Sequence, residues 1–269
     1  MRDFLRQIFR APQTPARSAR TDRHLELAEA PAALYAIGDV HGCLDELLAL
    51  ESQILTDSAA LPGEKVIVML GDYVDRGPNA AGVIDHLMAR PPAGLRRICL
   101  LGNHELMAQD FMAKPNPRSN WLQNGGFDTL QSYGIMPDVL RSARSAQWSM
   151  MIKAHVPEEH IDFMRGLAWS LSIPGWLFVH AGLRPGLSLQ EQHPDDLFWI
   201  RDEFYSTVDQ LAAQDVERRV VHGHTPAPEP VITPARICVD TGAFATGRLT
   251  AVRIVPDEQP RMLHTGPAV

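Results

Sequence analysis

Short apolar runs alternate with polar clusters along the first part of the chain, and this pattern repeats. Each of the apolar runs at residues 34–37, 66–70 and 98–101 is followed directly by Gly-Asp or Gly-Asn. Such runs predict buried strands, and the segments at residues 44–55 and 83–88 show the apolar spacing of helices. The polar clusters recur after 33 and 31 residues, which is the length of a βαβ unit. We therefore expect parallel strands joined by helices.

Apolar runs continue in the second half of the chain, after a long stretch of different character. Residues 106–174 combine helical spacing with loop signals, and we predict a helical insertion there. Apolar runs at residues 176–179, 220–221 and 237–239 each precede a His or an Asp and predict further strands. A last strand over residues 249–255 is expected to close a sheet edge. The predicted fold class is α/β.

The two ends of the chain differ in composition from its centre. Residues 1–31 are rich in Arg, Ala and Pro, so we predict a flexible basic extension, one domain over residues 32–256 and a tail over residues 257–269. Residues 1–24 hold six arginines against two aspartates, and the total charge of −7 leaves −11 for the rest. An acidic domain argues against a nucleic-acid partner. The extension is expected to make at most weak contact with an acidic partner or an anionic membrane.

Composition places the chain among soluble, cytoplasmic proteins. Hydrophobic residues make up 45% and charged residues 21%, which supplies a sizeable core. Because no uncharged apolar run approaches the roughly 20 residues that cross a bilayer as a helix, we expect no transmembrane segment. The start of the chain also lacks the apolar region of a secretory signal. Cys43, Cys99 and Cys238 are far apart in sequence, so we expect free thiols in a reducing compartment.

The polar clusters bring a particular kind of chemistry to one edge of the predicted sheet. Ligands of open α/β sheets bind outside the carboxyl ends of the strands. A Gly-Asp after one strand is often only a turn, but three at matched spacing do not fit turn chemistry alone. Side chains that offer oxygen and nitrogen ligand atoms, with no thiolate among them, suit manganese, iron, zinc or magnesium. The residues gathered there are Asp39, His41, Asp72, Asp75, Arg76, Asn103, His104, His180, His222 and His224.

Two metal ions fit this set best, because Asp72 lies on the middle of three successive units and a carboxylate can bridge two cations. Arg76 and Arg201 would attract an anion, and phosphate suits the planar donor fork of an arginine. His222 remains ambiguous, since strand alternation could aim both His222 and His224 inward.

Several of these blocks carry a family resemblance. The blocks at residues 38–42, 71–77, 102–105 and 179–182 resemble the signatures of phosphoprotein phosphatases, a branch of the calcineurin-like metallophosphoesterases. Further blocks, at residues 120–126, 199–201, 223–226 and 240–242, look like bacterial and phage members. Leu101 and His180-Ala181-Gly182 differ from the eukaryotic pattern and also point to a bacterial type. The resemblance spans about residues 34–254 and implies central mixed β-sheets flanked by helices.

The resemblance implies a role for each matching residue. It places two divalent metals in the site, with manganese expected in vitro and iron, zinc or magnesium as alternatives. It makes His104 the general acid, oriented by Asp75, and puts Arg76 and Arg201 on the phosphoryl oxygens, with Asn103 and His104 also contacting substrate. The implied ligands are Asp39, His41 and Asp72 on the first metal, and Asp72, Asn103, His180 and His224 on the second.

The implied function is a phosphoprotein phosphatase for phosphoserine and phosphothreonine, with some tolerance for phosphotyrosine. In the resembling enzymes a metal-bridging hydroxide attacks phosphorus directly. The alternative is a symmetrical diadenosine tetraphosphate hydrolase. Those enzymes typically carry Ala and Asp where this chain has Asp75 and Glu105, although Leu101 matches them. A third hypothesis is a catalytically silent phosphate-binding module. Such a module would normally have lost a metal ligand or the general acid.

Overall fold

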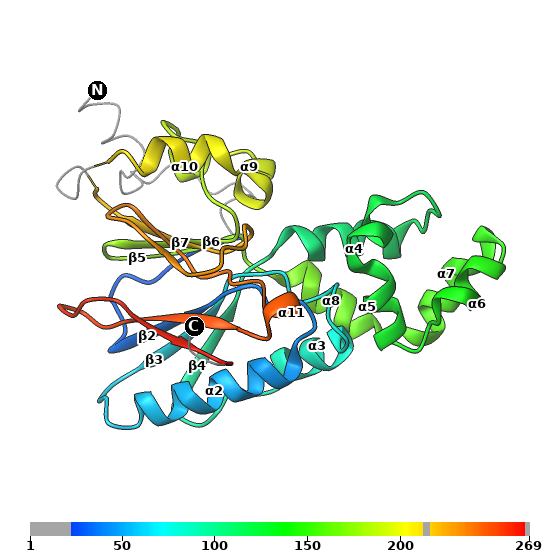
Figure 1. Cartoon of the computed structure of the whole chain (residues 1–269), viewed down its shortest axis with the longest axis horizontal. Coiled ribbons are helices and arrows are strands. Elements are labelled where there is room, and N and C mark those ends of the chain that lie inside the picture. The colour runs from blue at the N-terminus through cyan, green and yellow to red at the C-terminus, as the bar shows by residue number, and fades with distance from the viewer. Residues whose placement is uncertain (1–22, 212–215, 267–269) are drawn as a thin grey trace.

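Two β-sheets lie face to face at the centre of the molecule, with helices outside each of them (Figure 1). The computed structural model describes residues 23–211 and 216–266. Each sheet contains both parallel and antiparallel pairs. The predicted α/β class with mixed sheets is therefore confirmed.

The repeated units of the sequence form a sheet of five strands. The three predicted strands are parallel and in register, with Tyr35 opposite Ile67 and Ile67 opposite Arg97. Helices α2 (Leu44–Ser58) and α3 (Ala80–Met88) run along the outer face of this sheet (Figure 1). In spatial order the strands are β11 (Arg261–His264), β10 (Thr250–Ile254), β2 (Ala33–Ile37), β3 (Lys65–Met69) and β4 (Leu95–Cys99).

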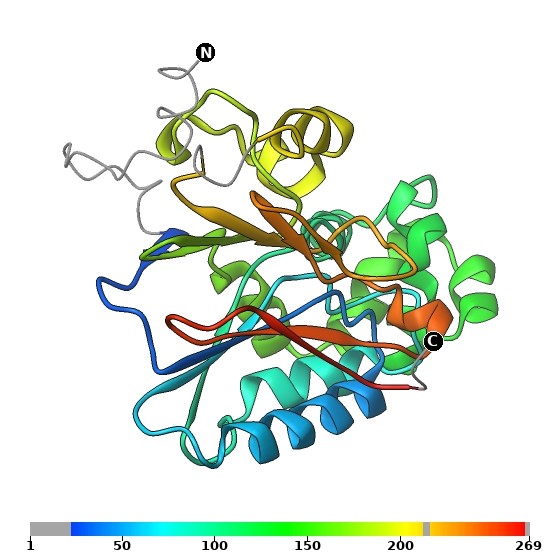
Figure 2. The ribbon, with the colours of Figure 1, turned by 60° about the vertical axis from the view of Figure 1, so that its left-hand side comes forward.

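The later apolar runs build the second sheet. Helices α9 (Pro194–Trp199) and α10 (Asp202–Val208) lie on its outer face, and Figure 2 shows the two sheets stacked between these helices and α2. In spatial order its strands are β1 (His24–Glu26), β5 (Ser170–Ile173), β6 (Trp176–Val179), β7 (Arg219–His222), β9 (Arg236–Cys238) and β8 (Val231–Ile232).

Strand alternation divides the core into two layers. In β2, Leu34 and Ala36 pack between the sheets in one cluster with Phe178 of the second sheet. Tyr35 and Ile37 belong to the larger cluster that includes the buried faces of the helices. Successive side chains of a strand point to opposite faces, so one strand contributes to both layers. This double burial, worth about 1.5–3 kcal/mol for each large side chain, fixes the strand ends that carry the polar clusters.

The predicted helical insertion forms a lobe beside the two sheets (Figure 1). It starts slightly earlier than expected, because Asn103 is already the first residue of a helix, and its last helix ends at Gly166. Residues 170–173 of the predicted insertion belong to β5 instead. The lobe contains α4 (Asn103–Ala113), a kinked turn η2 (Leu122–Gly126), α5 (Phe127–Ser132), α6 (Pro137–Ser142), α7 (Ser145–His155) and α8 (Glu158–Gly166).

The predicted ends of the domain need correction. Strand β1 pairs with β5 over His24–Glu26, so the fold begins before Ala32. The strand predicted at residues 249–255 is present as β10 but does not close the sheet, because β11 pairs with its outer side. Residues 257–269 are therefore not simply a tail. Both missed strands are three or four residues long and have no clear alternation.

Residues 1–22 of the predicted basic extension lie outside the described residues. In the described parts of the chain, no helix is long and apolar enough to span a membrane. All three cysteines are free, as predicted.

Candidate metal centre

The carboxyl ends of five strands deliver polar side chains to one place. His41 follows β2, Asp72 follows β3, and Asn103 and His104 open the helix after β4. His180 directly follows β6, and His224 follows β7 after one intervening residue. All six side chains are at least 95% buried. The structure thus brings together the residues that the sequence placed at the strand ends.

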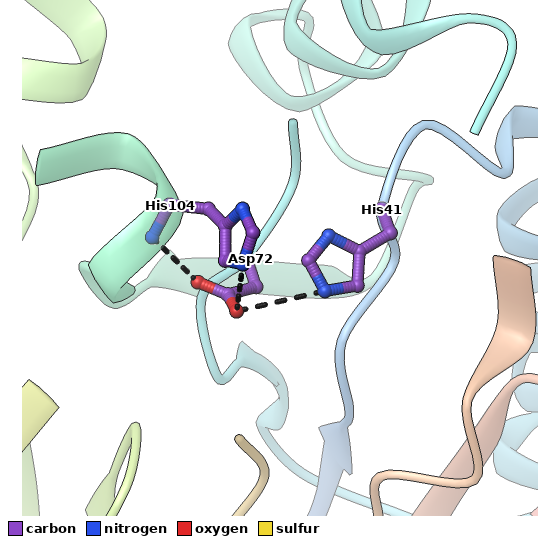
Figure 3. A group of neighbouring side chains, drawn as sticks. All are labelled: His41, Asp72 and His104. Carbon is purple, nitrogen blue, oxygen red and sulfur yellow. Dashed lines mark hydrogen bonds and ion pairs between the residues drawn. The ribbon is translucent and has the colours of Figure 1, made fainter. Parts of the chain in front are cut away.

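Asp72 offers one carboxylate oxygen to each of two ligand groups. Its Oδ2 lies 3.6 Å from Nε2 of His41 and 3.8 Å from Nε2 of His104 (Figure 3). Its Oδ1 lies 3.4 Å from Nε2 of His180, on the side of His224. In each group the potential ligand atoms lie within 4.8 Å of one another. This is the arrangement expected of a carboxylate that bridges two cations.

His41 and His180 present lone pairs, not protons, to the carboxylate of Asp72. Nδ1 of His41 donates to the Val74 carbonyl at 2.8 Å, and Nδ1 of His180 donates to the Leu70 carbonyl at 2.9 Å. Burial lowers the pKa of His41 to about 3 and also lowers that of His180, so both rings are neutral near pH 7. Their Nε2 atoms consequently carry lone pairs.

The second group fits a metal ion on this chemistry. The Nε2 lone pair of His180 faces two oxygens, Asp72 Oδ1 and, at 2.8 Å, Asn103 Oδ1. His224 Nδ1 lies 2.9 Å from the same Asn103 oxygen, and its Nε2 is buried without a partner. Burial lowers the pKa of His224 to about 2, which leaves this ring neutral as well. The His180 Nε2 lone pair and the oxygens of Asp72 and Asn103 have no proton between them and repel, and a divalent cation among them removes the repulsion.

Asp39 lies beside this arrangement and not within either ligand group. Both of its carboxylate oxygens accept from the backbone N–H of His224, at 3.2 and 3.1 Å. Burial, and then the nearby carboxylates of Asp240 and Asp72, raise the pKa of Asp39 well above its usual range. Asp240 is also buried, and its own pKa is raised to about 6, chiefly by burial. Three crowded carboxylates favour cations in the site.

A hydrogen-bond network holds the His104 ring at Nδ1, the ring nitrogen that does not face Asp72. Nδ1 of His104 donates to Oδ2 of Asp75 at 2.6 Å, and Nε1 of Trp121 donates to the same oxygen at 2.8 Å. Oγ1 of Thr129 donates to the other carboxylate oxygen at 2.7 Å. Burial disfavours the imidazolium, but the carboxylates of Asp72 and Asp75 outweigh it and raise the pKa of His104. The ring is therefore well placed to hold a proton on Nε2.

The two arginines act on different ligand groups. Nη1 of Arg76 donates to Nε2 of His41 at 2.9 Å, so its guanidinium rests on the nitrogen that the first group offers to a metal. Arg201 is exposed, and its charge lowers the pKa of both His180 and His224. Arg76 thus contacts the first group directly, whereas the charge of Arg201 acts on the second group.

Glu105 holds the loop that carries the bridging carboxylate. Its Oε2 accepts from the backbone N–H groups of Asp72 and Gly102, at 2.8 and 3.0 Å. Its Oε1 accepts from those of Tyr73 and Val74, at 2.7 and 3.2 Å. This carboxylate is fully buried. Glu105 therefore supports the backbone beneath Asp72 and does not face the ligand groups.

The backbone at the site is strained. Among the described residues, six that are not glycine have positive φ, and five of them lie here. Each such conformation costs about 1–3 kcal/mol and persists where surrounding contacts impose it. Backbone N–H groups of His41 and Val40 both donate to the Asp72 carbonyl, which ties two of the loops together. The five are His41, Asp72, Asp75, Arg76 and His224.

His222, which the sequence left ambiguous, is not part of either ligand group. Its ring stacks on Tyr205, and Nη1 of Arg236 lies 3.2 Å from its Nε2. The motifs predicted Trp121 as scaffold around the site, but they did not predict the supporting roles of Thr129 and Glu105. Of these, Glu105 gave a signal by its place in the Gly-Asn-His-Glu block.

Comparisons with known proteins agree with this geometry. A family model described as calcineurin-like phosphoesterase matches residues 33–247. A serine/threonine-protein phosphatase 1 from Salmonella typhimurium is 26% identical over 231 residues, which cover 82% of this chain and 91% of that protein. A symmetrical bis(5'-nucleosyl)-tetraphosphatase from Yersinia pestis is 44% identical over 72 residues, 27% of this chain and 22% of that protein.

The fold also matches a solved structure. A protein described as a "putative diadenosine tetraphosphatase" superimposes with a TM-score of 0.62 at 20% sequence identity. The match covers 91% of this chain and 99% of that one. At this identity the likeness shows the fold.

Proposed function

Since the chain belongs to the calcineurin-like phosphoesterase family, we propose that it is a phosphoprotein phosphatase that hydrolyses phosphoserine and phosphothreonine monoesters. The observation that carries the proposal is the pairing of a bridging carboxylate, Asp72, with an imidazole, His104, that is buried 3.8 Å away and hydrogen-bonded to Asp75. The Asp72 carboxylate supports the binding of two metal ions, and the His104 imidazole supports protonation of a leaving alkoxide.

The chain's own residues supply the remaining steps. Asp39, His41 and Asp72 would hold one divalent ion, and Asp72, Asn103, His180 and His224 the other. When bound, two such ions lower the pKa of water and neutralise charge on the phosphoryl oxygens. Arg76 and Arg201 orient the phosphoryl group by donating to its oxygens. His104 gives the proton on Nε2 to the leaving oxygen, while Asp75 keeps the ring aimed.

A protein substrate is favoured over a dinucleotide on two grounds. The likeness to the serine/threonine-protein phosphatase extends over 91% of that protein, whereas the likeness to the tetraphosphatase covers 22% of that enzyme. Asp75, which the dinucleotide hydrolases typically replace by Ala, here accepts three hydrogen bonds from His104, Trp121 and Thr129. Hydrolysis of diadenosine tetraphosphate remains the second candidate because of the 72-residue match.

A parallel assay tests the proposal. Protein loaded with Mn²⁺ is given a phosphoserine peptide and, separately, diadenosine tetraphosphate, and phosphate and ADP are quantified. We expect phosphate release from the peptide with the higher kcat/KM. ADP formation without peptide dephosphorylation would reject the phosphoprotein assignment in favour of the second candidate.

A further inference from the structure

Two exposed aromatic rings stand at the candidate metal centre. Among the described residues, ten large hydrophobic side chains are exposed, and the aromatic ones are Trp199 and Phe244, exposed by 42% and 41%. The Phe244 ring lies 5.5 Å from that of His41, and the Trp199 ring lies 6.2 Å from that of His224. Each exposed ring therefore flanks a different ligand group.

An arginine accompanies each ring. The guanidinium carbon of Arg76 lies 4.9 Å from the centre of the Phe244 ring, which is cation–π distance. Trp199 is two residues before Arg201, whose charge acts on the second ligand group. A group bound by Arg76 thus lies next to a flat apolar surface.

The backbone that carries both rings is held by the fold. Phe244 is on the short helix α11 (Ala243–Thr246), at the junction of the sheets and the helical lobe (Figure 1). Gly242 enters this helix at φ 66°, and its carbonyl accepts from the N–H groups of Ala245 and Thr246. Trp199 ends α9 between the buried Phe198 and Ile200. Stacking of a planar group on either ring therefore requires no ordering of the backbone beneath it.

We infer that Phe244 and Trp199 are specificity-determining residues that favour phosphate esters carrying a planar aromatic group as additional substrates. This inference rests on the proposed phosphatase function and adds aromatic esters to its phosphoserine and phosphothreonine substrates. The aromatic group has two possible sources, the phenol ring of phosphotyrosine and the bases of a dinucleotide. Aromatic pairs stack offset or edge to face, and both sources offer such faces.

The test compares the ratio of kcat/KM values for a phosphotyrosine and a phosphoserine peptide of the same sequence. In Phe244→Leu this ratio is expected to fall about three- to tenfold, the range of one aromatic pair. The fall should be in KM, because stacking is equal in the ground and transition states. Phe244→Tyr keeps the ring and should keep the ratio. Leu48→Ala, which trims an exposed leucine on α2, is the matched control.

Trp199→Leu, with Trp199→Phe as the ring-preserving variant, separates the two sources. If the bases of a dinucleotide are the natural group, both Leu variants lower kcat/KM for diadenosine tetraphosphate more than for phosphotyrosine. An unchanged ratio in both Leu variants overturns the inference. Equal losses on all substrates with weaker phosphate inhibition also overturn it, because Phe244 would then only position Arg76. Failure of the proposed function is distinct, since the unmodified protein would then hydrolyse neither peptide.

Discussion

Glu105→Gln removes one acceptor atom from beneath the bridging carboxylate. In the protein as it stands, each oxygen of Glu105 accepts from two backbone N–H groups, and the side chain is fully buried. The glutamine amide retains one oxygen, so its NH₂ group must face two N–H donors. Each unsatisfied buried donor costs about 1–3 kcal/mol. We therefore expect unfolding free energy to fall by about 2–6 kcal/mol.

Equilibrium unfolding in urea measures this loss, first with a chelator and then with excess Mn²⁺. The chelated protein reports the loop contacts alone, whereas the metal-loaded protein also reports any loss of affinity through Asp72. Glu158→Gln is the control, because Glu158 is exposed in the first turn of α8 and should change stability by less than about 1 kcal/mol. A loss below about 1 kcal/mol in chelated Glu105→Gln would refute the assigned role of this carboxylate.

Three further predictions follow from named contacts. His104→Asn should keep both metals, by elemental analysis, while kcat falls roughly 10²–10⁴-fold; loss of metal would make His104 a ligand. Arg76→Ala should weaken competitive inhibition by phosphate at unchanged metal content, and Arg76→Lys should rescue poorly because an ammonium lacks the planar donor fork. Buried Glu51 bonds His86 and Arg97 at 2.8 and 2.7 Å, and these partners outweigh burial and lower its pKa below 4.5. Because the folded pKa is depressed, this stabilisation is present above pH 4.5 and is lost as the pH falls through the folded value. Glu51→Gln should therefore flatten the acid limb of the unfolding free energy, and an unchanged limb would contradict this.

The sequence predicted the parts of the molecule that depend on local pattern. Apolar runs and helical spacing located β2, β3, β4, α2 and α3, because burial imposes these periods on consecutive residues. The Gly-Asp and Gly-Asn clusters located the ligand groups, since the carboxyl ends of neighbouring strands meet at one edge.

Features that depend on contacts distant in sequence were not predictable in this way. Glu105 accepts hydrogen bonds from the backbone N–H groups of residues 72–74, and these bonds can form only when β3 and β4 are paired. Asp39 could be placed near the metals by its motif, but its contact with the His224 N–H requires the two sheets to meet. Strands β1 and β11 are stabilised by their partners and carry little periodicity of their own.

The bridging role of Asp72 is tested most directly by metal stoichiometry. Apo protein and its Asp72→Asn variant are titrated with Mn²⁺ by calorimetry, and bound metal is counted after desalting. The geometry of Asp72, with one oxygen toward each ligand group, predicts two ions in the unmodified protein. In the variant, a neutral amide cannot bridge two cations, so tight binding of the pair and phosphatase turnover should both be lost. Two tightly bound ions with normal turnover in Asp72→Asn would contradict the dinuclear centre.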